Sequence, residues 1–391
     1  MTREHALLSA SSAERWLNCT PSARLAENYE DTTSPYAAEG ILAHELAEAI
    51  LTYELEKTDA TTQSFKDYID KIKSHEMFYE GMIDEVEDYT NYVLETYHEA
   101  VAKTKDAKIF LEERLDFSMY VPEGFGTGDC IIIADGEMEI IDLKFGKGVE
   151  VSPINNPQLK LYALGAYEKY GFIYGIEKIT MTIAQVRLNN ISSWTITASM
   201  LEEWAEEELK PKAAEAYEGK GETIPGSWCT FCKIRQICRA RAEMNLGLYD
   251  KFKKDPKLLS VEEIAEILGQ APDIQKWAKE MQDYALDEAL KGTRYPGFKL
   301  VEGRSNRKIE DEEGLAKALL NEGYEEAKIY KPKTLEAITN LEKVVGKKKF
   351  AELAKEFIVK PPGKPTLVPE SDKRPELDSV ENEFFQLKIN K

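Results

Sequence analysis

The chain of 391 residues is acidic, with 51 Lys and Arg against 71 Asp and Glu and a formal net charge of −20. This charge argues against broad electrostatic capture of nucleic acid, so any contact with DNA needs local basic patches. Residues 291–391 carry 21 basic against 18 acidic side chains, so the excess negative charge lies in the rest of the chain. A hydrophobic content of 42% is ordinary for a globular protein with a large core and a smaller second region.

Membrane-directing signals are missing from the sequence. The segment from Met1 to Cys19 holds no apolar run of signal-peptide length, and no uninterrupted apolar stretch is long enough to span a bilayer. We therefore expect a cytoplasmic protein without a membrane partner. Five cysteines, an odd number in a large chain without an export signal, favour a metal or cluster site over a disulfide framework.

The amino-terminal part is expected to be helical. Apolar residues recur at helical spacing over 36–55, and a long acidic helical region follows to about Ala102. On a different face of the first helix, Gly40, His44 and Glu48 lie four residues apart and therefore share one side. From spacing alone, a surface or hydrogen-bonded histidine and a metal-binding histidine both remain open.

Residues 126–144 predict a β-hairpin. Two apolar runs flank Asp135-Gly136, which is a two-residue turn signal. That turn places Asp129 opposite Asp142, and Lys144 then projects from the same face as Asp142. Two carboxylates and a lysine are what metal-dependent phosphodiester hydrolysis needs, with Mg²⁺ or Mn²⁺ as the ion. Acidic residues at the open ends of hairpins are also commonly solvated, so the hairpin alone leaves both interpretations open.

The segments around the hairpin predict an α/β arrangement. A strand is expected over 108–117 before the hairpin, and another over 178–186 after it. Between them, Asn156-Pro157 predicts the start of a helix that ends near Tyr170, before Gly171. Gln158 and Tyr162 lie one turn apart on this helix, and core packing is the default expectation for Tyr162.

The cysteines predict a second metal centre. Cys229, Cys232 and Cys238 lie close together among aromatic and basic residues, and Cys19 brings the number of thiolates to four. Four thiolates suit either a tetrahedral zinc or a [4Fe–4S] cluster. A zinc ribbon more often shows paired C-x2-C units, whereas one ligand far away in sequence suits a clasp that joins the two ends of a domain. Cys130, inside the hairpin, is expected in the core.

The carboxy-terminal part predicts a small α+β region and then a tail. A helix is expected over 258–290, a strand over 298–309, and helices over 312–321 and 334–357, the last one rich in lysine. Beyond Lys360, proline and charged residues predict an extended or disordered segment.

Gly40-x3-His44, Gly128-Asp129, Asp142-Leu143-Lys144 and Gln158-x3-Tyr162 follow one another in an order that resembles the RecB-like branch of the PD-(D/E)XK nuclease superfamily. The early cysteine and the later C-x2-C-x5-C resemble the iron–sulfur members of that branch, which include the AddB nuclease domain and the CRISPR-associated RecB-like exonucleases. The overall sequence is most similar to phage and prophage members. The resemblance covers about residues 9–240.

The resemblance implies a restriction-endonuclease-like fold, a mixed central sheet flanked by helices, over residues 1–245. It leaves 246–360 as a helical or α+β accessory region and 361–391 as the tail. It also assigns three sets of functional residues. The catalytic set is Asp129, Asp142, Lys144, Gln158 and Tyr162. The ligands of Mg²⁺ or Mn²⁺ are His44, Asp129, Asp142 and the backbone carbonyl of Leu143. The ligands of a structural [4Fe–4S] cluster are Cys19, Cys229, Cys232 and Cys238, with zinc as the less favoured occupant.

The activity that the resemblance implies is that of a deoxyribonuclease, an exonuclease acting on single-stranded DNA or DNA ends in phage replication or recombination. It would work in the bacterial host's cytoplasm, with a phage helicase or a single-strand-binding protein as a candidate partner. The alternative is a catalytically silent nuclease-fold subunit that binds DNA ends or a partner, which the acidic composition fits slightly better. A silent site, however, is expected to have lost at least one of Asp129, Asp142 and Lys144.

Overall fold

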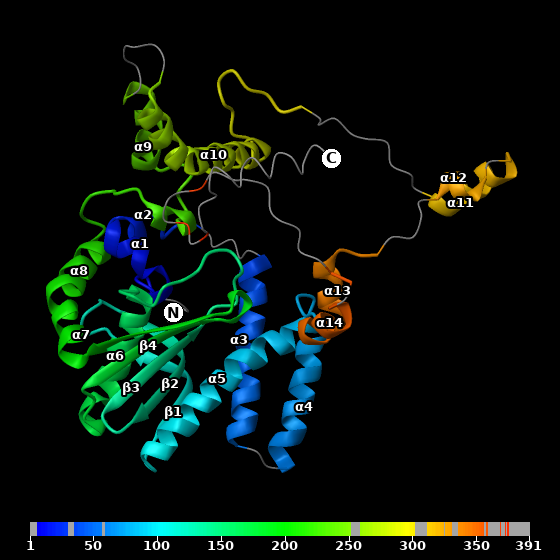
Figure 1. Cartoon of the computed structure of the whole chain (residues 1–391). Coiled ribbons are helices and arrows are strands. Elements are labelled where there is room, and N and C mark those ends of the chain that lie inside the picture. Colours follow the sequence, from blue (N-terminus) through cyan, green and yellow to red (C-terminus); the bar gives the residue numbers. More distant parts are fainter. Residues whose placement is uncertain are drawn as a thin grey trace.

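The computed structural model describes residues 6–29, 35–56, 59–251, 259–301, 311–323, 325–330, 335–355, 357–358, 368, 372 and 374. Within these residues a five-stranded mixed sheet is flanked by helices, and the amino-terminal region is helical (Figure 1). The expected fold class is therefore confirmed. Among the described helices, none combines the length and the apolar character needed to cross a membrane.

The strands follow one another across the sheet in the order of the chain. They are β1 (Lys108–Asp116), β2 (Phe125–Ala134), β3 (Glu137–Leu143), β4 (Lys178–Gln185) and β5 (Asn190–Thr197). Neighbouring strands are antiparallel except β3 and β4, which run parallel and are joined by the crossover helix α6 (Pro157–Tyr174). The sequence analysis did not predict β5. This edge strand has a polar sequence whose side chains alternate in exposure, so it has a weak apolar signal.

The β2–β3 hairpin forms in the predicted register. Ala134 pairs with Glu137 and Cys130 pairs with Ile141, so the open end brings Asp129 and Asp142 to neighbouring positions. Asp135 and Gly136 have φ angles of 50° and 75°, the left-handed pair that a type I′ turn requires. Local turn chemistry therefore sets the register that the active-site prediction depends on.

Helix α6 begins as predicted and ends later. The Asn156 side chain accepts hydrogen bonds from the backbone N–H of Gln158 and of Leu159, at 3.0 and 3.3 Å. The expected stop at Gly171 is wrong, because the helix continues to Tyr174 and Gly175 takes the left-handed conformation, with φ of 58°. A glycine inside a helix is tolerated, and a left-handed residue is what ends one.

Helices cover both faces of the sheet (Figure 1). One face packs against α3 (Pro35–Leu55) and α5 (Gly81–Lys103), with α4 (Asp59–Lys73) beside α3. The other face packs against α6 and α7 (Ala198–Trp204), and α1 (Ala13–Asn18) packs on α6. A π-helical turn (Ala205–Leu209) leads from α7 into α8 (Lys210–Glu218), and α2 (Ser22–Ala26) lies against α8. Cys130 is fully buried under α3 and α5, as expected.

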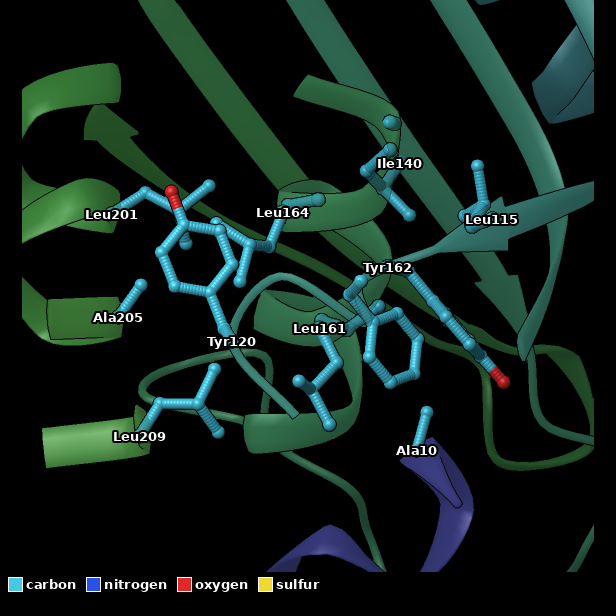
Figure 2. Packing of buried hydrophobic residues seen from close by; sticks show 14 of the residues in the cluster. Ala10, Leu115, Tyr120, Ile140, Leu161, Tyr162, Leu164, Leu201, Ala205 and Leu209 are labelled. Carbon is cyan, nitrogen blue, oxygen red and sulfur yellow. The ribbon is translucent and has the colours of Figure 1, made fainter. Parts of the chain in front are cut away.

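Aromatic and aliphatic side chains fill the face under α6 to α8. Figure 2 shows Leu161 and Leu164 of α6 next to Tyr120 and the residues of α7 and the π-helical turn. Tyr162 belongs to the same cluster and is 7% exposed, so its expected place in the core is confirmed. Its hydroxyl points away from the apolar side chains (Figure 2).

The regular structure in the described carboxy-terminal residues is helical. They form α9 (Arg239–Lys251), α10 (Val261–Leu290), α11 (Glu312–Asn321), α12 (Glu326–Ile329), α13 (Ile338–Val345) and α14 (Lys347–Ala354). The lysine-rich helix is broken at Gly346, which has φ of 83°, and its two halves pack against α5. The strand expected over 298–309 is not formed in 298–301, and 302–309 lie outside the described residues. The predicted tail lies almost wholly outside them too.

The first prediction concerns the close contact between α6 and β1. A Cβ atom added at Gly165 would lie 2.9 Å from Cβ of Leu115, a distance that forces the helix or the strand to move. We expect Gly165→Ala to lower the free energy of unfolding by about 1–3 kcal/mol. Gly269→Ala is the matched control, because a Cβ on α10 there meets nothing within 4 Å. It should stabilise its helix by up to about 1 kcal/mol. Thermal melts of both variants, followed by circular dichroism, test this, and equal melting temperatures would contradict it.

Candidate functional site

A change of side-chain direction in β1 creates the site. Leu111 packs on the face covered by α3 and α5, whereas Leu115, an even number of residues later, packs on the α6 face. On a regular strand the two would share a face. Between them Glu112 has φ of 46°, a left-handed conformation that turns the strand. The register on either side places Glu112 opposite Asp129 of β2. Irregularities of this kind commonly re-aim a side chain next to a functional site.

His44 of α3 meets these two carboxylates. Its Nδ1 atom lies 3.5 Å from Oδ1 of Asp129 and 4.0 Å from Oε1 of Glu112. In the part of the chain that the structure describes, these three residues form a group whose potential ligand atoms all lie within 4.8 Å of one another. Glu112 was not among the predicted ligands. The loop between β1 and β2 is not a tight turn, so the sequence offered no register that would pair Glu112 with Asp129.

The protonation of this group follows from its charges. Burial lowers the pKa of His44, but the carboxylates of Asp129, Asp142 and Glu112 together raise it more, and the result is a pKa of about 9. Burial raises the pKa of Glu112 to about 7, and the neighbouring Asp129 carboxylate adds to this rise. The metal-free site therefore retains protons to relieve repulsion between its carboxylates. A divalent cation between the same groups relieves the same repulsion.

Asp142 and Lys144 form the second half of the site. Oδ2 of Asp142, a residue only 2% exposed, lies 2.9 Å from Nζ of Lys144. Gln158 of α6 accepts a hydrogen bond from Lys144 Nζ at 2.9 Å. Its amide nitrogen donates to Asp142 at 3.2 Å and to the Tyr162 hydroxyl at 3.1 Å. Burial lowers the pKa of Lys144, but the carboxylates of Asp142 and Asp129 together raise it more, so the lysine keeps its proton.

Asp129 joins the two halves. Its Oδ1 atom faces His44, and its Oδ2 atom accepts the backbone N–H of Leu143 at 2.7 Å. Asp142 is not part of the close group around His44, because its oxygens contact Lys144 and Gln158. The structure thus brings all the predicted catalytic and metal-binding residues to one end of the sheet. Asp129 lies against His44, and Asp142 lies against Lys144.

The site opens into a pocket on one side and is closed on the other. The pocket has a volume of about 410 Å³ and lies between α3 and Glu112. Gly40 lines it, and a Cβ atom there would meet nothing within 4 Å. On the closed side Tyr89 of α5 is 1% exposed, and among the described residues its hydroxyl has no hydrogen-bond partner. Burial raises the pKa of Tyr89, and the nearby charges of Cys130 and the site carboxylates raise it further.

The position of α3, which carries His44, is held by a buried arginine. Arg187 follows β4, and its guanidinium lies 3.0 Å from Glu39 of α3 and 3.2 Å from Glu85 of α5. The same guanidinium stacks over the ring of Phe145, the residue after Lys144, at 4.6 Å. One charged group therefore ties both helices to the end of the sheet where the carboxylates stand.

The four predicted cluster ligands line one small cavity. Cys19 ends α1, and the other three come from the segment between α8 and α9. Burial raises the pKa of Cys19, and the charges of Cys229, Cys232 and Cys238 raise it further. The backbone N–H of Gly226 donates to Sγ of Cys229 at 3.4 Å. Four thiols that repel one another when ionised, with an N–H donor aimed at one sulfur, fit a shared cationic centre.

Two comparisons with known proteins bear on the chain. A family profile described as "Protein of unknown function (DUF2800)" matches residues 5–375. A solved structure described as "Crystal structure of SSO0001" aligns over 59% of this chain and 96% of that chain, with 14% sequence identity and a TM-score of 0.23. At that TM-score the likeness carries no argument about fold or function.

The second prediction tests the site as a metal centre. We expect MnCl₂ to raise the apparent melting temperature, by an amount equivalent to about 2.7 kcal/mol when Mn²⁺ is at 100 times Kd. Asp129→Asn should abolish this rise, because Asp129 contacts both halves of the site.

The control for this experiment is Asp135→Asn. It removes the same charge from the exposed turn at the far end of the same hairpin and should retain the full effect of Mn²⁺. Potassium chloride at matched ionic strength excludes a general salt effect. A Mn²⁺-dependent rise that survives in Asp129→Asn would show that the ion binds elsewhere.

Proposed function

We propose that this chain, which belongs to the DUF2800 family, is a metal-dependent deoxyribonuclease that hydrolyses phosphodiester bonds with a metal-activated water. One observation carries the proposal: Asp129, Asp142 and Lys144 converge at one end of the sheet, and Gln158 fixes the lysine against Asp142. The RecB-like resemblance described above supports the same assignment for the same residues.

The residues at the site divide the chemistry between them. The oxygens of Asp129, Asp142 and the Leu143 carbonyl, with His44, would hold Mg²⁺ or Mn²⁺, ions that favour oxygen ligands. When bound, the ion supplies Lewis acidity and lowers the pKa of a coordinated water. Lys144 is placed to orient that water or to neutralise charge that develops on the phosphate.

Gln158 holds Lys144, and the Tyr162 hydroxyl in turn holds Gln158. Gln158 uses both ends of its amide group, accepting from Lys144 and donating to Asp142 and to the Tyr162 hydroxyl. This fixes the rotamer of Lys144 before substrate arrives, which is the preorganisation that electrostatic catalysis requires. In this proposal both residues also position the DNA backbone.

Single-stranded DNA or DNA ends are the proposed substrate, and exonucleolytic cleavage in phage replication or recombination is the proposed role. The loop after Lys144 supports contact with a phosphate backbone, since it contains Lys147 and two glycines. The buried Gln185 side chain holds this loop by donating to the carbonyls of Gly146 and Val149, at 3.1 and 2.8 Å. We place the protein in the cytoplasm of the bacterial host, with a helicase or single-strand-binding protein as partner.

A structural [4Fe–4S] cluster is the proposed occupant of the cysteine cavity. Four thiols lining one cavity suit either a tetrahedral zinc or a cluster. The spacing C-x2-C-x5-C with one distant cysteine, which resembles the iron–sulfur members of the RecB-like branch rather than a zinc ribbon, supports the cluster over zinc.

The alternative function is a catalytically silent nuclease-fold subunit that binds DNA ends or a partner. The net charge of −20 favours it slightly over an enzyme that must grip DNA. The presence of Asp129, Asp142 and Lys144 favours the enzyme. A protein that only binds DNA or a partner has no need for two carboxylates that repel each other.

The third prediction tests catalysis directly. End-labelled single- and double-stranded DNA is incubated with Mg²⁺ or Mn²⁺ and with the wild-type protein or Lys144→Ala. We expect the wild type to shorten single strands and Lys144→Ala to be slower by about 10²–10³-fold, as for the loss of one preorganised donor.

Lys178→Ala is the matched control for this assay. It removes a lysine from the other end of the sheet, where Lys178 pairs with Glu137 at 2.8 Å, and should keep full activity. Equal activity of wild type and Lys144→Ala would point to a contaminant or a different active site. DNA binding without cleavage in the wild type would favour the silent subunit.

The fourth prediction concerns the cysteine centre. Protein purified without oxygen should be brown and contain iron and sulfide, whereas zinc would leave it colourless. Cys19→Ser should lose most of the colour and lower the melting temperature, because it removes the ligand that ties α1 to the segment before α9. Cys130→Ala, the control, changes the fully buried cysteine of β2 and should stay brown. A brown Cys19→Ser protein with unchanged iron content would exclude Cys19 as a ligand.

A further inference from the structure

We infer that Arg15 and Ser22 donate hydrogen bonds to the sulfur atoms of the centre bound by the four cysteines, and that these bonds raise its reduction potential. The inference rests on the [4Fe–4S] cluster that is part of the proposed function. It adds that two side chains outside the cysteine motif set how readily the cluster is reduced.

Two buried polar atoms at the cysteine cavity carry the inference. Arg15 of α1 and Ser22 of α2 line this cavity together with the four cysteines. Among the described residues, neither Nε of Arg15 nor Oγ of Ser22 has a hydrogen-bond partner, although both atoms are buried. Ser22 as a whole is only 2% exposed. A buried donor without an acceptor is costly, so we expect the complete centre to supply the acceptors.

Other hydrogen bonds fix both residues at the cavity. Nη1 of Arg15 donates to the backbone carbonyl of Phe231, in the middle of the C-x2-C unit, at 3.2 Å. The guanidinium therefore reaches from α1 to the segment that carries the later cysteines, and its Nε–H is left for a different acceptor. The backbone N–H of Ser22 donates to the carbonyl of Cys19 at 2.9 Å, which places the serine hydroxyl close in sequence to the first cysteine.

Backbone donors already point at two of the four sulfurs. The N–H of Gly226 donates to Sγ of Cys229 at 3.4 Å. Burial raises the pKa of Cys19, and a backbone hydrogen bond from Ile224 lowers it, so this sulfur accepts an N–H as well. Among the described residues that line the cavity, none is an aspartate or a glutamate. The cavity therefore offers donors and positive charge, which suit a centre that is negatively charged.

The charge of the centre explains why these donors affect its reduction. Four thiolates give a [4Fe–4S] centre a net negative charge, and reduction adds one more electron. Hydrogen bonds to sulfur therefore stabilise the reduced form more than the oxidised form, which raises the reduction potential. The Arg15 guanidinium also keeps its positive charge at any pH that the protein meets, so it offsets part of the negative charge.

A redox titration of the full chain, purified without oxygen and followed by the visible absorbance of the cluster, tests the inference. Arg15→Met keeps much of the side-chain length and removes the donors and the charge, whereas Ser22→Ala removes only the hydroxyl. We expect each variant to make reduction about tenfold less favourable, as for the loss of one hydrogen bond to a charged group. For a one-electron couple this is a shift of about 59 mV to lower potential. Iron content per chain is measured on the same samples.

Arg15→Lys separates the charge of Arg15 from its hydrogen bond. Lysine keeps the positive charge but has no N–H group at the position of Nε. We therefore expect Arg15→Lys to have a lower potential than the wild type. A wild-type potential in this variant would show that the charge alone acts on the centre, and it would overturn the hydrogen bond from Arg15.

Arg24→Met and Thr20→Val are the matched controls. Both residues belong to the same amino-terminal segment, but their side chains donate to the backbone carbonyls of Tyr217 and Lys220, at 2.6 and 2.7 Å. We expect both variants to lower the melting temperature and to leave the reduction potential unchanged. Shifts in the controls as large as those in Arg15→Met and Ser22→Ala would trace the effect to general loosening of the segment and overturn the inference.

The outcomes separate the inference from the proposed function. The wild-type potential in both Arg15→Met and Ser22→Ala, with full iron content, would overturn the inference and leave the cluster in place. A colourless wild-type protein without iron would overturn the cluster and the inference together. A brown wild-type protein that shows the expected shifts in its variants but cleaves no DNA would overturn the nuclease and support the sulfur donors.

Discussion

Three carboxylates stand next to one another on adjacent strands, and the rest of the structure is arranged to keep them there. Glu112, Asp129 and Asp142 come from β1, β2 and β3 and lie at one end of the sheet. Like charges in neighbouring strand positions destabilise a sheet. Lys144 offsets part of this repulsion, as does the raised pKa of His44. An arrangement that is unfavourable without an ion is one that an ion stabilises.

The surrounding fold limits how far these groups can move apart. A type I′ turn sets the register of β2 and β3, and α6 brings Gln158 against Lys144 through a capped first turn. Arg187 holds α3 and α5 to the same end of the sheet. Each device lies on or directly beside a strand or a helix, so the site depends on the regular elements rather than on a long loop.

The cysteine cavity lies where the amino-terminal helices α1 and α2 meet the segment that follows α8. Thr20 and Arg24 donate to backbone carbonyls of Lys220 and Tyr217, at 2.7 and 2.6 Å, so the amino-terminal helices already dock on the end of α8. Beyond the cavity, Arg235 and Arg241 form ion pairs with Glu280 of α10. A centre bound by Cys19 and the three later cysteines would add coordination bonds to these polar contacts.

The sequence by itself determined the elements whose signals are local. The Asp135-Gly136 turn and the flanking apolar runs set the hairpin register, and so predicted that Asp129, Asp142 and Lys144 meet. The Asn156 cap set the start of α6, whereas only the family resemblance implied that Gln158 joins them. Tertiary structure alone decided what depends on contacts distant in sequence. These are the edge strand β5, the place of Glu112 opposite Asp129, and the approach of His44 from another layer. The physical reason is that a tight turn determines its own register, whereas packing of separate layers determines which side chains meet across them.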